Sequence, residues 1–458
     1  AVLQLGVTMD FAIFLYHSYQ AELKNTTDRN QAMSIAISKT FTSVLGSSLT
    51  TIAGFLALCS MNLTLGKDIG IVMAKGVLFG VISVVTILPS LILMFDKAIQ
   101  KTKHKELLPK FTTISEFNIK HYKAIIVIFL IALPIALYGY NNTKVYYKLD
   151  SSLPETLDSI SANNTLKDKF GLVSQEMILI NKDTPNDEIN EMLDKIEELD
   201  GVDFTLSYSK LSELGIPEEM LPEDLLSIFQ SDKYQIILIN SKYEIATDEL
   251  NNQIAKINEI VKQYDSNAKV VGEGPLMKDL VEISDHDFNS VNTVSIGIIF
   301  VIMMFVLKSI SLPVLLVIAI EFAIFINMGI PYYTNTTIPF IASIVIGTIQ
   351  LGATIDYAIL ITTKYIQNRK DGKDKKQAVS EALGTSINSI IVSGLCFFGA
   401  TFGVGAYSKI EMIGSLCSLM ARGAIVSMVT VLTVLPAFLM LFDKIICKTT
   451  IGMRKIEN

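Results

Sequence analysis

The sequence predicts an α-helical polytopic membrane protein that carries one α/β domain outside the membrane. Half of its residues are hydrophobic, only 18% are charged, and its mean hydropathy is +0.45. Long apolar runs recur along the chain, and one long polar segment interrupts them. A short motif centred on an aspartate occurs twice within these runs, which indicates a duplicated membrane unit.

Nine apolar runs are long enough to cross a bilayer as helices. Short connections separate most of them, whereas residues 142–290 are polar. The expected spans are 1–19, 43–61, 70–95, 123–141, 291–308, 312–330, 338–365, 387–406 and 413–442.

The polar segment reads as a compact α/β unit. Alternating apolar residues predict strands, and amphipathic stretches rich in acidic residues near their starts predict helices. We expect strands at 175–181, 202–208, 234–240 and 268–271, and helices at 185–199 and 247–264. This order of strands and helices matches a ferredoxin-like split βαβ domain.

The distribution of basic residues predicts the orientation. The segments 20–42, 96–123, 308–311, 364–386 and 443–458 hold 21 Lys and Arg, whereas the short opposite loops hold two. Because cytoplasmic loops are enriched in Lys and Arg, the first set faces the cytoplasm and 142–290 faces outward. That outer segment has 30 acidic against 13 basic residues, so nothing here indicates a nucleic-acid partner.

Asp10 and Asp356 lie deep in their apolar runs, within Gly6-Val7-Thr8-Met9-Asp10-Phe11-Ala12 and Gly352-Ala353-Thr354-Ile355-Asp356-Tyr357-Ala358. At about 1.5 Å per residue they stand about 15 and about 12 Å from the next polar stretch, near the middle of a roughly 30 Å core. An ionisable residue at that depth costs roughly 2.5–3.5 kcal/mol. We therefore interpret both as functional rather than as lone buried polar groups in a helix contact.

The repeat extends well beyond the motif. Ala32, Ser43 and Ser47 recur 346 residues later as Ala378, Ser389 and Ser393. Met73-Ala74-Lys75-Gly76, Pro89 and Phe95-Asp96-Lys97 recur 347 residues later as Met420-Ala421-Arg422-Gly423, Pro436 and Phe442-Asp443-Lys444. This duplication predicts two six-helix repeats, with nine of twelve helices in this chain and an amino-terminal part missing.

These boundaries define five parts. Residues 1–122 form the end of the first repeat with a cytoplasmic linker, and 123–141 the first helix of the second repeat. Residues 142–290 form the outer domain, 291–445 a bundle of five helices, and 446–458 a cytoplasmic tail.

Further polar residues lie within the expected spans. Ser47 and Ser393 could support the two carboxylates from neighbouring helices, with Gly6 and Gly352 allowing close packing. Glu321 fits either a coupling role or a buried hydrogen bond between helices. Lys75 and Arg422 fit either snorkelling to the outer interface or a charge partner for the carboxylates.

The paired Gly-x-x-x-Asp motifs, the Leu-Pro endings at 88–97 and 435–444, and the α/β insert resemble the resistance–nodulation–division superfamily, and within it the mycobacterial-membrane-protein-large (MMPL) family. The resemblance implies a twelve-helix, proton-driven exporter of lipids, amphiphiles or hydrophobic drugs in the bacterial cytoplasmic membrane. It places the proton relay at Asp10, Asp356 and Tyr357, and Phe11 departs from the pattern because it has no hydroxyl. Protons, the bilayer and a hydrophobic substrate are the implied partners, and the sequence allows a homo-oligomer.

No phosphate-binding loop, CxxC pair or metal-ligand spacing occurs in the sequence, so we expect no cofactor, no metal and no enzymatic activity. Two other functions fit the same features. One is a proton-driven protein-export accessory of the Sec type, and the other is a sterol-sensing-like membrane protein that binds lipid without transport.

Cysteine labelling in intact cells tests the orientation. A Lys105→Cys side chain should be protected from a membrane-impermeant thiol reagent, and an Asp187→Cys side chain should react, because 96–123 is basic and 142–290 is acidic. Reaction of the cysteine at position 105 from outside would contradict the orientation.

Overall fold

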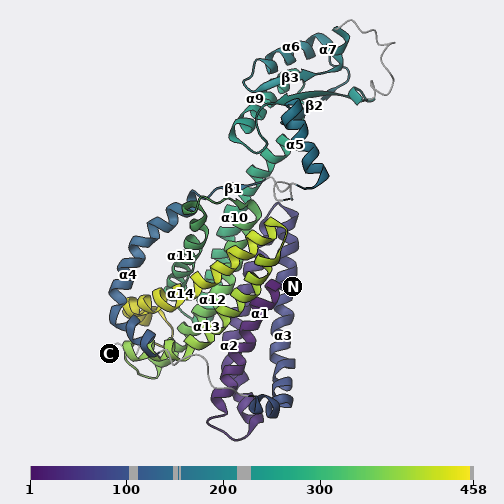
Figure 1. Cartoon of the computed structure of the whole chain (residues 1–458). Coiled ribbons are helices and arrows are strands. Elements are labelled where there is room, and N and C mark those ends of the chain that lie inside the picture. The colour runs from purple at the N-terminus through teal and green to yellow at the C-terminus, as the bar shows by residue number, and fades with distance from the viewer. Residues whose placement is uncertain (1, 103–111, 148–152, 154–155, 214–227, 454–458) are drawn as a thin grey trace. The chain divides into compact units, whose positions relative to one another are not determined.

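The computed structural model describes residues 2–102, 112–147, 153, 156–213 and 228–453 (Figure 1). The chain forms two compact units. The larger comprises Ala1–Val145 and His286–Asn458, and the smaller comprises Tyr146–Asp285.

Long helices build the larger unit. They are α1 (Val2–Glu22), α2 (Arg29–Ala57), α3 (Thr64–Lys101), α4 (Thr112–Asn141), the part of α10 (Glu273–Leu307) from His286 onward, α11 (Ser311–Tyr333), α12 (Phe340–Lys370), α13 (Lys375–Tyr407) and α14 (Glu411–Thr449). The 3-10 turn η1 (Leu58–Ser60) joins α2 to α3, and the short strands β1 (Val145–Tyr146) and β6 (Ile338–Pro339) follow α4 and precede α12.

Among the described residues, eight helices are long and apolar enough to cross a membrane. The ninth expected span, 1–19, is helical as α1 but is not one of the eight. Gln4, Asp10 and His17 lower its mean hydropathy. The prediction of a mostly helical, polytopic membrane protein is confirmed.

Helix α12 lies at the centre of this unit. It packs against α2, α11, α13 and α14, and 89% of its most apolar stretch is buried. Helix α1 packs against α2, α3 and α13. Helices from the two ends of the sequence therefore interleave, which brings the two aspartate motifs into one bundle.

A four-stranded antiparallel sheet forms the smaller unit. Its strands are β2 (Ser174–Asn181), β3 (Val202–Leu206), β4 (Tyr234–Ser241) and β5 (Lys269–Gly272), in the order β3-β4-β2-β5. The helices are α5 (Asp158–Phe170), α6 (Asn186–Glu197), α7 (Tyr208–Glu213) and α9 (Asp248–Tyr264). The four strands and two helices expected above appear, although β3 ends two residues early because Tyr208 begins α7. A further short helix expected at 218–229 lies mostly outside the described residues.

The core of the smaller unit lies between the sheet and the helices α6 and α9. Residues at spacings of three and four on α6 face the sheet, because that spacing places them on one side of a helix. The buried cluster contains Ile178, Ile180, Ile189, Met192, Leu193, Ile196, Ile237, Ile239, Ile257, Val261 and Ala268. Helix α5 contributes no buried residue, and the sequence does not predict it because it has no apolar face.

One carboxylic acid lies inside this smaller unit. Glu176 on β2 is fully buried, and its Oε1 accepts a hydrogen bond of 2.5 Å from the Ser174 hydroxyl. Its Oε2 has no hydrogen-bond partner within the described part of the chain. Burial therefore raises the pKa of Glu176, because the charged form loses its contact with water.

A Glu176→Gln substitution should stabilise the sheet at neutral pH. A raised pKa makes the folded protein bind more protons than the unfolded chain, so wild-type stability falls as the pH rises from the ordinary carboxyl value through the raised one. Glutamine stays neutral, and we expect a gain on the order of 1 kcal/mol at pH 7 that disappears near pH 4. Hydrogen exchange of β2 in the whole protein measures this, with Glu259→Gln, an exposed residue of α9, as the control. A gain that is equal at both pH values would refute the assignment.

Candidate functional site

Asp10 lies on α1 inside the helix bundle, with 2% of its surface exposed. Its Oδ1 accepts a hydrogen bond from the hydroxyl of Ser393, which is fully buried on α13. A carboxylate buried among apolar helices needs such a donor, because water does not solvate it there.

Tyr357 extends this contact to a third helix. Its hydroxyl on α12 lies 3.1 Å from the Ser393 hydroxyl. A serine hydroxyl has one proton, so when Ser393 donates to Asp10, the bond between the two hydroxyls is donated by Tyr357. The result is a continuous hydrogen-bonded path from Tyr357 through Ser393 to Asp10.

Asp356 precedes Tyr357 on α12 and meets a different helix. Its Oδ1 accepts a long hydrogen bond of 3.5 Å from Thr51 on α2, and Ser47 lies beside it on the same helix. Neither Oδ2 of Asp356 nor the Ser47 hydroxyl has a partner at good geometry within the described residues. The two carboxylates are close enough for their charges to interact.

The structure therefore gathers most of the residues that the sequence singles out. Asp10, Ser393 and Tyr357 meet directly, and Asp356 lies beside Ser47. Phe11 is fully buried and adds a ring without a hydroxyl. Asp10 is consequently better supplied with hydrogen-bond donors than Asp356.

The two motif glycines differ in how tightly they are packed. A Cβ atom on Gly6 would come within 2.7 Å of the Phe397 ring on α13, so Gly6 allows α1 and α13 to approach closely. A Cβ atom on Gly352 would stand 3.6 Å from Thr51 Cγ2, which is ordinary contact. Of the two motif glycines, only Gly6 lies where a Cβ atom would clash with a neighbouring side chain.

Arg422 and Lys75 occupy matching places in the sequence but different surroundings. The Arg422 guanidinium donates to the side chain and the carbonyl of Asn327 on α11, at 2.9 and 2.6 Å. Lys75 is exposed. Glu321 on α11 has one buried carboxylate oxygen with no hydrogen-bond partner in the described part of the chain.

A network of polar side chains that the sequence analysis did not single out lies beside Tyr357. Asn327 donates to Gln350 at 2.7 Å, and Gln350 donates to Ser427 at 3.0 Å. Thr354 lies 2.7 Å from Ser427 through its hydroxyl. The signal in the sequence is the spacing of Gln350, Thr354 and Tyr357, which places them on one face of α12.

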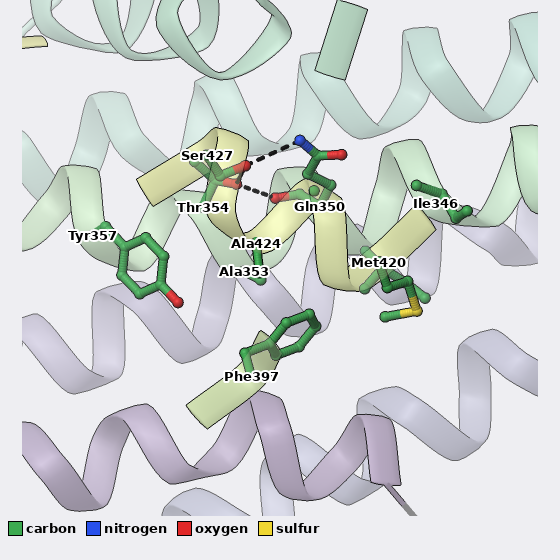
Figure 2. A pocket seen from close by; sticks show the side chains of 11 residues that line it. Ile346, Gln350, Ala353, Thr354, Tyr357, Phe397, Met420, Ala424 and Ser427 are labelled. Carbon is green, nitrogen blue, oxygen red and sulfur yellow. Dashed lines mark hydrogen bonds between the residues drawn. The ribbon is translucent and has the colours of Figure 1, made fainter. Parts of the chain in front are cut away.

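This network borders a cavity of about 20 Å³ between α12, α13 and α14 (Figure 2). Tyr357 lies at one end of it, and Ile346 and Met420 lie at the other (Figure 2). Gln350, Thr354 and Ser427 line the wall between them, opposite Phe397.

A second polar cluster joins the far ends of α12 and α14. The Tyr365 hydroxyl donates to Asp443 at 2.5 Å, and Arg369 donates to the same carboxylate at 3.2 Å. The corresponding contacts between α1, α2 and α3 are made by Tyr19, Arg29 and Asp96. Asp96 and Asp443 are equivalent in the repeat, but the sequence pattern predicts no contact for either of them.

Comparison with known proteins identifies the relatives of this chain. The model of the MMPL family matches residues 1–114 and 191–451. The putative membrane protein ActII-3 of Streptomyces coelicolor is 23% identical over 448 residues, which cover 95% of this chain and 60% of the relative. The mycolic acid-containing lipids exporter MmpL11 of Mycolicibacterium smegmatis is 23% identical over 39% of this chain and 19% of its own. The siderophore exporter MmpL5 of Mycobacterium tuberculosis is 22% identical over 37% of this chain and 18% of its own.

Substitution of the two motif glycines tests the packing of the site. Gly6→Ala should destabilise the bundle by about 1–3 kcal/mol, because the new methyl group forces Phe397 to move. Gly352→Ala is the matched variant and should be neutral or slightly stabilising, since alanine is the better helix former. Thermal unfolding of the detergent-solubilised protein measures both. Equal effects at the two positions would contradict the inference that the close packing of α1 and α13 requires a glycine at position 6.

Proposed function

From the premise that this chain belongs to the MMPL family, we propose that it is the membrane and outer-domain part of a proton-driven exporter. Its proposed substrates are lipids, other amphiphiles or hydrophobic drugs. The chain spans 60% of the length of ActII-3 and smaller fractions of the other two relatives, so the activity of the whole protein is part of this proposal.

The observation that carries the proposal is the path from Tyr357 through Ser393 to Asp10. A carboxyl group inside a membrane bundle can exist in neutral and charged forms, and hydroxyl groups can pass a proton to it. Moving one charge across a membrane potential of 100 mV is worth about 2.3 kcal/mol. This energy would drive a cycle in which Asp10 and Asp356 take up a proton on one side and release it on the other.

Equivalent contacts in the two repeats support the same proposed function. Ser393 on α13 contacts Asp10, and Ser47 on α2 lies beside Asp356, at positions 346 residues apart. Gly6 faces Phe397 and Gly352 faces Thr51, which are again equivalent positions. Each motif helix thus packs against a helix of the other half, as expected for two repeats related by pseudosymmetry.

We propose that residues 146–285 form a ferredoxin-like outer domain that handles substrate after it leaves the membrane. The antiparallel strand order β3-β4-β2-β5, with α6 and α9 as the connecting helices, supports the split βαβ assignment. Fold alone does not establish a role, so the assignment to substrate handling rests on family membership.

The proposed substrate class follows from the relatives. MmpL11 is named as an exporter of mycolic acid-containing lipids and MmpL5 as a siderophore exporter. We propose a hydrophobic or amphiphilic substrate for this chain and no enzymatic reaction, with proton movement as the only chemistry.

Asparagine variants of the two carboxylates test the proton coupling. Asp10→Asn and Asp356→Asn preserve size but cannot carry a proton, and each should lower substrate-dependent proton movement by about 100-fold or more. The measurement uses protein in proteoliposomes with an entrapped pH-sensitive dye and a panel of fluorescent lipids. Asp68→Asn on the exposed start of α3 is the matched control and should be silent. Full activity in the double Asp10→Asn, Asp356→Asn variant would eliminate the relay.

A Tyr357→Phe substitution tests the hydroxyl path separately from the carboxylates. It removes the group that contacts Ser393 and keeps the buried ring, so proton movement should slow by about tenfold without unfolding. The same dye assay, with thermal unfolding as the check on folding, measures it. An unchanged rate would show that the proton reaches Asp10 by another route.

A further inference from the structure

A hydrogen-bonded series that begins on α11 and α14 ends at Thr354 and Ser427, which line the same cavity as Tyr357. Arg422 donates a hydrogen bond to Asn327, and Asn327 donates one to Gln350. Gln350 and Thr354 both form a hydrogen bond with Ser427. The Thr354 hydroxyl can donate either to the Ser427 hydroxyl at 2.7 Å or to the backbone carbonyl of Gln350 at 2.6 Å. Two neighbouring hydroxyls that can exchange the donor role are what proton transfer along a series of groups requires.

The cavity beside this series joins it to Tyr357. Thr354, Ser427 and Tyr357 line the same small cavity, and Gln350 lies further along its wall (Figure 2). A water molecule needs about 10–15 Å³ of such space and two to four polar partners, so this cavity of about 20 Å³ holds one water beside these side chains. Water in this cavity would therefore bridge Thr354 and Tyr357.

The series lies on the outer side of Tyr357. Gln350 and Ile346 precede Tyr357 on α12, toward Phe340, whereas the basic segment 364–386 follows it. With the orientation predicted from the basic residues, Phe340 marks the outer end of this helix. The cavity therefore leads from Tyr357 toward the outside.

Within the described residues, α1 and α3 lack two of the hydroxyl groups of this series. The position of Ser427 is taken there by Gly80, and the position of Tyr357 by Phe11, so two hydroxyls are missing from the same copy. A Cβ atom on Gly80 would overlap Thr8, which shows that α1 and α3 are tightly packed at this point. The two copies therefore differ at two hydroxyl groups that could carry a proton.

We propose that Ser427, Thr354 and the cavity form an outer entry path for protons that serves Asp10 and not Asp356, an inference that rests on the proposed function. A proton from outside water reaches cavity water through Ser427 and Thr354, each oxygen accepting one proton and releasing another. Cavity water protonates the Tyr357 oxygen as Tyr357 gives its own proton to Ser393. Ser393 passes its proton to Asp10, so one proton leaves outside water and one carboxylate becomes neutral.

Arg422 and Asn327 are positioning residues in this path. Arg422 donates to both the side chain and the carbonyl of Asn327, which fixes the amide that donates to Gln350. Gln350 in turn donates to Ser427 and leaves the Ser427 proton free to be passed on.

The rate at which Asp10 is protonated tests the path. In the reconstituted protein, a rapid drop of the outside pH is followed by the infrared carboxyl band of each aspartate, assigned with Asp10→Asn and Asp356→Asn. Ser427→Ala should slow the Asp10 band by about tenfold and leave the Asp356 band unchanged, because only Asp10 is reached through Tyr357. Ser427→Thr should restore the rate, since it keeps the hydroxyl.

The matched control is Thr433→Val, six residues further along α14. Among the described residues its hydroxyl donates only to the backbone carbonyl of Val429 in its own helix, so its loss should change neither band. An unchanged Asp10 rate in Ser427→Ala would overturn the path while leaving the proposed function intact. If neither aspartate changes its protonation in the wild-type protein, the proposed function itself fails.

Discussion

A charged group inside a membrane bundle must receive hydrogen bonds from other helices, and this constraint organises the larger unit. Asp10 takes its donor from α13 and Asp356 takes its donor from α2, so each motif helix is packed against a helix of the other half. Gly6 allows the first of these pairs to approach closely. The central position of α12 follows, because it carries both Asp356 and the hydroxyl that completes the path to Asp10.

Much of this arrangement could be predicted from the sequence. Apolar runs and their spacing predicted the helices, and alternating residues predicted the four strands, because both signals are local. The pairing of Asp10 with Ser393 could also be anticipated, since the motif and its supporting serine recur at the same offset of 346 residues. A carboxylate in an apolar run needs a partner, and a small hydroxylated residue in a repeated helix is the natural candidate.

The remainder depends on contacts between residues far apart in the chain. Arg422 and Lys75 are equivalent in sequence, yet only Arg422 meets Asn327, which lies on a helix outside the repeated segment of the first half. From the sequence alone, Asp443 marks only the end of a repeated apolar helix. The fold places Tyr365 and Arg369 beside it. Helix α5 has no apolar face, so periodicity could not predict it.

The contacts of Asp443 with Tyr365 and Arg369 anchor one end of α12. Arg369 and Tyr365 tie the end of this helix to α14, so a motion that preserves the ion pair cannot slide α12 along its axis and must tilt it about that end. Tyr357 lies twelve residues from Arg369, about 18 Å along the helix, and a tilt of about 5° displaces it by about 1.6 Å. A displacement of that size would break the 3.1 Å contact between Tyr357 and Ser393, and with it the connection to Asp10.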